Sequence, residues 1–247
     1  MRYRNIVHAE WGKLWALRST WVVFAVVGAL AVGLAAAIGA TAEHPAPGQV
    51  FLAIDVFSVL LGVFGILMVT GEYGSGLIRA TFAAVPRRLP VLWAKAAVLT
   101  AATVPLMLLV CSGSLLVNHA LTPEAHRYPL GDGGLVRATL GAAAAPVALA
   151  LLGLGIGALL RHTAAAITVY VLSMLVLPAL LGAALPASVA DDVVRCVPVA
   201  AAQALYALPG GGDAARTLAP GPAALVLLAW VAAALAAGAV TLRRRDP

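Results

Sequence analysis

Few residues in this sequence have the types and spacing that catalysis, nucleotide binding or metal binding requires. The interval from Gly71 to Gly76 is the nearest approach to a P-loop, GxxxxGK[ST], which holds nucleotide phosphates. Leu77 and Ile78 stand where that loop needs its lysine and its hydroxyl. The HExxH motif of metalloproteases and the GxSxG nucleophile elbow are also missing. We therefore expect no enzymatic activity, no bound nucleotide or other cofactor, and no metal in this chain.

The other titratable residues are scattered. His119, Glu124 and His126 share one loop, but a metal site needs converging ligands, and single polar loop residues usually meet only solvent. Asp55 lies inside an apolar run, where an acid is a candidate for ion-coupled transport. It lies within two turns of the end of that run, which favours a capped or interface-facing acid.

The composition places the chain in a membrane. Of its 247 residues, 62% are hydrophobic and 11% are charged, whereas soluble domains average about 45–50% and about 25%. The two cysteines, Cys111 and Cys196, give neither a disulfide framework nor a metal spacing. The net charge of +6 is explained by basic residues on the cytoplasmic side rather than by nucleic-acid binding.

Six apolar segments are long enough to cross a hydrocarbon core of about 30 Å. They predict an all-α integral membrane protein, a single transmembrane domain over residues 1–247. Within the fourth segment, Gly153 and Gly157 form a small-xxx-small step that permits close helix packing. The expected spans are about 20–40, 50–69, 90–117, 135–160, 164–185 and 221–242.

Two further segments have distinct patterns. Residues 1–18 carry apolar side chains at spacings of three and four, which predicts an interfacial amphipathic helix before the first span, with a plain cytoplasmic tail as the alternative. The outer segment 186–220, between spans five and six, contains a mostly apolar stretch, Val193–Leu208. Such a stretch suits a short hairpin buried against the rest of the protein.

The basic residues orient the chain. If both termini are cytoplasmic, the inner side holds 12 of the 16 lysines and arginines, a strong positive-inside bias. The connection between the second and third spans, Thr70–Lys95, then lies inside the cell. The inner basic residues are Arg2, Arg4, Lys13, Arg18, Arg79, Arg87, Arg88, Lys95, Arg161 and Arg243–Arg245.

Several motifs occur in a recognisable order. HAEWGKLWALRSTW precedes the first span, and Gly71–Arg79 (GEYGSGLIR) follows the second. Next come the pair Pro86-Arg87 and then Lys95. GLGIGALLRHTAAAI follows at the end of the fourth span, and a proline-bearing apolar segment lies around Val197–Ala202. With these motifs the chain resembles the six-span permease subunit of ABC-2 type ABC transporters over nearly its whole length. Leu77 stands where that family often has threonine.

The resemblance implies a mechanism and partners. Two permease copies, identical or different, would form an export path in a bacterial inner membrane, and separate cytoplasmic ABC ATPase subunits would bind the ATP. A cytoplasmic coupling helix after the second span would dock into a groove of the ATPase. The implied coupling residues are Glu72, Gly74, Gly76, Leu77, Ile78, Arg79 and Phe82, with a second cytoplasmic contact at Arg161 and His162.

Leu77, Ile78 and Phe82 give this stretch an apolar face, and Arg79 gives it a charge. Arg87 and Arg88 have no such face and are expected to meet lipid headgroups or to support the structure of the loop. An ion-coupled secondary transporter or channel remains the alternative, and a lipid-modifying enzyme is disfavoured because reactive residues do not converge. The Ala-, Leu- and Val-rich spans suit an apolar or amphipathic cargo but equally suit plain lipid contact.

Overall fold

The computed structural model of the protein describes residues 3–16, 18–41, 47–85, 87–124, 127–208 and 218–244. Helices joined by short connections form this part of the chain, and no strand occurs within it. Six described segments are long and apolar enough to cross a membrane, which confirms the predicted six-helix membrane architecture. These are Thr20–Thr41, Gln49–Gly74, Leu89–Leu121, Gly133–Leu160, Thr163–Ala184 and Pro220–Arg244.

Most spans are single long helices: α2 (Arg18–Thr41), α3 (Ile54–Gly74), α5 (Leu89–Leu121), α6 (Gly133–Leu160) and α11 (Pro220–Arg244). The second span begins with a short 3₁₀ turn, η1 (Pro47–Phe51). It continues to Gly74, five residues beyond the predicted end at residue 69.

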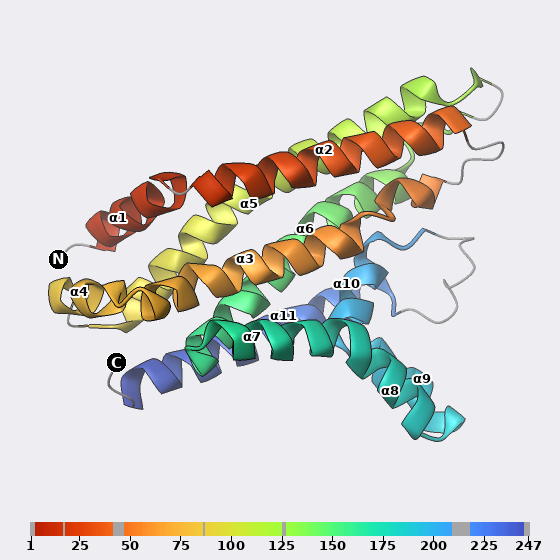
Figure 1. Ribbon diagram of the computed structural model, residues 1–247. Coiled ribbons are helices and arrows are strands. Elements are labelled where there is room, and N and C mark those ends of the chain that lie inside the picture. Colours follow the sequence, from red (N-terminus) through yellow and green to blue (C-terminus); the bar gives the residue numbers. More distant parts are fainter. Residues whose placement is uncertain are drawn as a thin grey trace.

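The fifth span changes direction between α7 (Thr163–Val171) and α8 (Leu177–Ala184) (Figure 1). A single π-helical turn, η3 (Leu172–Val176), joins them, and the Leu177 amide donates to the carbonyl of Leu172. Pro178 follows directly and has no amide hydrogen to donate to the helix ladder. The wider turn and the proline together account for the bend.

Helix α6 lies at the centre of the bundle, in contact with α3, α5, α7, α10 and α11. Its glycines face two neighbours. A Cβ atom added at Gly153 would meet the backbone of Gly62 on α3, and one at Gly157 would lie 3.0 Å from the carbonyl oxygen of Ile66. A Cβ at Gly155 would lie 2.6 Å from Ala234 on α11. The predicted Gly153/Gly157 step therefore forms the close approach of α6 to α3.

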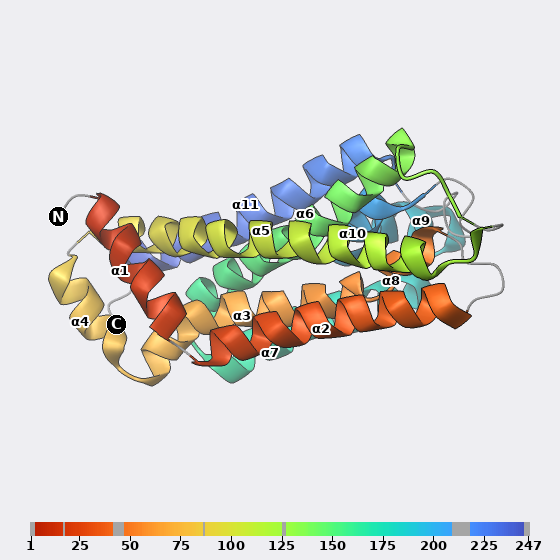
Figure 2. The same ribbon diagram turned by 90° about the horizontal axis from the view of Figure 1, so that it is seen from above.

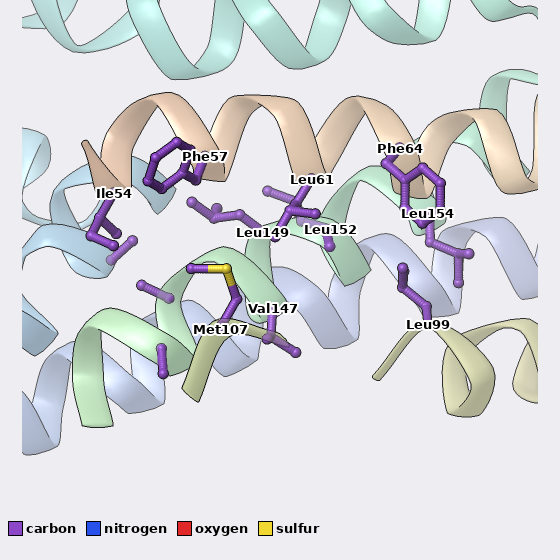
Figure 3. Packing of buried hydrophobic residues seen from close by; sticks show 14 of the residues in the cluster. Ile54, Phe57, Leu61, Phe64, Leu99, Met107, Val147, Leu149, Leu152 and Leu154 are labelled. Carbon is purple, nitrogen blue, oxygen red and sulfur yellow. The ribbon is translucent and has the colours of Figure 1, made fainter. Parts of the chain in front are cut away.

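Buried apolar side chains of α3, α5 and α6 fill the space between these helices (Figure 3). Phe57 and Leu61 of α3 lie beside Leu149 and Leu152 of α6, and Met107 of α5 lies beneath them. Because α3, α5 and α6 share this core, it fixes where the ends of these helices lie relative to one another.

The short elements gather at the two ends of the bundle. Helices α1 (Tyr3–Ala16) and α4 (Leu77–Ala84) lie at the end that also carries both labelled termini (Figure 1, Figure 2). We call this the basic end. Helices α9 (Ala187–Arg195) and α10 (Pro198–Tyr206) lie at the opposite end.

The predicted apolar outer segment is therefore helical over much of its length. Ala201, Ala202 and Ala204 of α10 are buried, and α10 packs on α6 and α11. Residues 209–217, the rest of this segment, lie outside the described residues.

Candidate functional site

Helix α4 begins at a backbone turn that requires glycine. Helix α3 ends at Gly74, and Gly76 then adopts a left-handed conformation with φ 74°. A side chain is disfavoured there, whereas glycine adopts this conformation freely. This turn lets the chain leave α3 and start α4 at Leu77.

The predicted coupling residues do not share one exposed face. Leu77 is 59% exposed, and Arg79 is also exposed, but Ile78 is only 5% exposed. Phe82 is half-buried, and the Arg88 guanidinium lies 5.4 Å from its ring centroid. Ile78 and Phe82 therefore pack against the protein's own chain and hold α4 in place. Leu77 and Arg79 remain available to a partner.

Beside α4 lies a partly buried group of charges, the four-charge cluster of Glu10, Lys13, Glu72 and Lys95. The Lys95 ammonium donates to Glu10 Oε2 at 2.7 Å and to Glu72 Oε1 at 2.6 Å. Lys13 donates to Glu10 Oε1 at 2.7 Å and to Glu72 Oε1 at 2.9 Å. Two carboxylates and two ammonium groups therefore neutralise one another.

The cluster joins four helices. Glu10 and Lys13 belong to α1, Glu72 to α3 and Lys95 to α5. Thr81 of α4 completes it, since its hydroxyl donates to Glu72 Oε2 at 3.2 Å. Glu72 of α3 thus links α4 to α1 and α5 through its hydrogen bonds.

Burial makes this arrangement costly to disturb. The side chains of Glu10 and Lys95 are 3% and 4% exposed, whereas that of Lys13 is 44% exposed. An ion left unpaired at such depth costs several kcal/mol. Burial by itself lowers the pKa of Lys13, but its hydrogen bonds and its attraction to Glu10 and Glu72 outweigh this and raise the pKa above 10.5.

Sequence reasoning singled out Glu72 and Lys95 but missed Glu10 and Lys13. The one available signal was the i, i+3 spacing of Glu10 and Lys13 on the face of α1 that also carries Leu14. Ile6 and Leu14 of α1 are buried, and α1 packs on α5. The predicted helix before the first span is present, and its place in a membrane interface stays a prediction.

A second junction lies where α6 ends. Arg161 caps α6 in a left-handed conformation and donates to the carbonyl of Thr241 at 2.7 Å, with its guanidinium 5.4 Å from the Tyr73 ring centroid. His162 is exposed, and its Nδ1 accepts the amide of Ala165 to cap α7. Arg161 therefore ties α6 to α11, and His162 is the more accessible of the predicted pair.

Arg88 has a structural contact, one of the two roles predicted for it. It is half-buried and donates to the carbonyl of Leu242 at 3.2 Å, so it caps α11 instead of simply facing lipid. Arg87 is exposed, as a headgroup contact requires. Pro86 lies outside the described residues.

At the opposite end, Asp55 is held by α10. Gln203 donates to it at 3.0 Å and the Tyr206 hydroxyl at 2.7 Å. Arg137 of α6 donates to the carbonyls of Leu205 and Ala207, which holds the same C-terminal end of α10. Burial and then the Asp55 carboxylate raise the pKa of Tyr206, so this hydroxyl keeps its proton.

Among the described residues, no group of three histidine, cysteine or acidic side chains could hold a metal ion. His126, one of the loop residues considered above, lies outside them. Cys111 is buried and Cys196 is exposed, and both are free thiols.

No protein-family model matches this chain, and no curated protein is significantly similar to it. Function must therefore be inferred from the geometry of the chain itself.

Proposed function

We propose that this chain is the membrane-spanning permease subunit of an ABC-2 type exporter, driven by separate cytoplasmic ATPase subunits. The observation that carries the proposal is α4, a short helix between the second and third spans that exposes Leu77 and Arg79. It is braced on α1, α3 and α5 through the four-charge cluster. A partner that binds this exposed helix would displace it, and the hydrogen bonds of the cluster would transmit the displacement to the spans.

The contact surface on α4 would be small. Leu77 supplies an apolar anchor and Arg79 a charge for an acidic or polar groove, while Ile78 and Phe82 keep the helix in place. Helix-in-groove docking commonly depends on a few such anchors. A second permease copy and the surrounding lipid would cover the exposed apolar faces of the spans.

Replacing Leu77 and Arg79 by Asp should separate ATP hydrolysis from transport. Loss of the main anchor is expected to lower transport at least about tenfold, while the amount of subunit in the membrane stays the same. The readout is co-purification of the ATPase together with ATP-dependent export from vesicles. Arg4→Asp, an exposed change on α1 of the same end, is the matched control.

Two results would overturn the proposal. One is transport by the isolated chain in liposomes that contain no nucleotide-binding protein. The other is normal coupling in the Leu77→Asp/Arg79→Asp variant.

The alternative is an ion-coupled secondary transporter or channel that uses Asp55. In that case transport would depend on a proton or sodium gradient and would be impaired by Asp55→Asn. The hydrogen bonds from Gln203 and Tyr206 favour a structural role for this acid, since they fasten α10 to α3.

A further inference from the structure

Aromatic side chains form a continuous row from α1 through α2 to α3. Trp11 and Trp15 of α1 meet edge to face, with ring centroids 5.7 Å apart, and the ring of Trp21 on α2 lies 4.8 Å from that of Trp15. Trp15 also contacts Phe24 of α2, which in turn contacts the buried Phe64 of α3. The row therefore begins at the surface and ends in the core of the bundle.

The bend between α1 and α2 holds these rings together (Figure 2). The Thr20 hydroxyl donates to the carbonyl of Leu14 at 2.7 Å, and the indole Nε1 of Trp21 donates to the carbonyl of Trp15 at 3.3 Å. Both acceptors belong to the last turn of α1, whose carbonyls have no partner within the helix. The bend is therefore fixed by side chains of α2 that cap α1. We call Trp11, Trp15 and Trp21 the tryptophan cluster.

The exposed surface changes character at this bend. On the N-terminal side of Trp21, the exposed side chains include Lys13 and Arg18. Beyond Trp21, Val22 and Val26 of α2 are 59% and 42% exposed. They belong to a candidate membrane span that begins at Thr20. The tryptophan cluster therefore lies where a polar surface meets an apolar one.

We propose that the tryptophan cluster anchors the bend between α1 and α2 in the headgroup layer of the lipid bilayer. Tryptophan is enriched at this layer because its large ring is apolar while its indole N–H is polar. Trp11 and Trp21 are 38% and 59% exposed, so both can contact lipid directly, and Trp15 lies between them. The occupant is the bilayer, because the exposed apolar face of α2 continues from the cluster. This anchor is independent of the proposed coupling role of α4.

The test uses the full-length protein reconstituted in phosphatidylcholine vesicles, with tryptophan fluorescence as the readout. Replacing Trp93 and Trp230 by Phe leaves only the tryptophan cluster to emit. Lipids brominated near the headgroup end of their acyl chains should quench this emission more strongly than lipids brominated near the chain ends. Adding Trp11→Phe/Trp21→Phe should remove most of the quenching by lipid, because the remaining Trp15 is half-buried.

A chain that keeps Trp230 as its single tryptophan is the matched control for depth. Trp230 is 43% exposed and lies near the middle of α11, which is a candidate span. Its emission should show the opposite order, with stronger quenching by bromines near the chain ends.

Three results would overturn the proposal. Stronger quenching of the cluster by the deeper bromines would place it within the hydrocarbon. Quenching by aqueous iodide without quenching by lipid would place it in water. Protection from both would show that protein, such as a second copy of the chain, covers it. The cluster-only chain keeps all three cluster tryptophans, so it carries the test even if Trp11→Phe/Trp21→Phe fails to fold.

Discussion

At the scale of single residues, Lys95 is the central member of the four-charge cluster. Its ammonium group is almost inaccessible and forms ion pairs with Glu10 of α1 and Glu72 of α3. Replacing a whole buried ion group by apolar residues can be nearly neutral, whereas removing one member is strongly destabilising. The cluster is therefore a determinant of how four helices fit together more than a source of net stability.

Lys95→Met should lower the free energy of unfolding by about 3–5 kcal/mol, because Glu10 and Glu72 then lose their buried cation. The measurement is equilibrium unfolding in mixed micelles. Adding Glu10→Gln and Glu72→Gln to the same chain should restore much of the loss. A single Lys95→Met variant as stable as the original protein would contradict this account.

The raised pKa of Lys13 makes part of the stability pH-dependent. The folded state holds this proton more tightly than the unfolded state, so the contribution is complete below 10.5 and is lost as the pH rises through the folded value. The difference in unfolding midpoint between the original protein and Lys13→Met should be constant near neutral pH and shrink above 10.5. A difference that stays constant through that range would argue against the ion pairs of Lys13.

At the scale of elements, the packing of α6 depends on which way each glycine faces. Gly153 and Gly157 face α3, and Gly155 faces α11. One helix can therefore approach two neighbours closely at once, because alternate positions along it lack side chains.

Gly153→Ala should destabilise the protein by about 1–3 kcal/mol, since its new Cβ would press on the backbone of Gly62. Gly113→Ala on α5 is the control, because a Cβ there meets nothing within 4 Å. That control should be neutral or stabilising by up to about 1 kcal/mol. Thermal unfolding of both variants in detergent distinguishes the outcomes, and equal effects would show that α6 does not lie so close to α3.

Some of these elements could be predicted from the sequence, and others could not. The spans follow from long apolar runs, and the Gly153/Gly157 contact follows from spacing, since both signals are local. The π-turn before Pro178 depends on how one proline is accommodated. The partners of Glu10 could not be predicted, because they come from residues that are distant in the chain and converge only when the helices pack.

At the scale of the whole molecule, an even number of spans brings both labelled termini to one end, together with α1 and α4 (Figure 2). The excess of described arginines and lysines at that end predicts that it faces the cytoplasm. The same reasoning predicts that α9 and α10 lie outside the cell.

Cysteine labelling can test this orientation once Cys111 and Cys196 have been replaced. Arg79→Cys and Arg243→Cys should react with a membrane-impermeant maleimide only in inverted vesicles. Val189→Cys on α9, where the native side chain is 47% exposed, should react only in intact cells. Reaction of Arg79→Cys and Val189→Cys from the same side would exclude the six-span topology.

The distance along the chain between Glu10 and Lys95 also bears on how the protein is made. The two residues are 85 positions apart, so α1 leaves the ribosome long before its buried cation has been synthesised. Until then Glu10 has only Lys13, on its own helix, as a cation partner. The buried contact that holds α1 on α5 can therefore form only after the third span has been made.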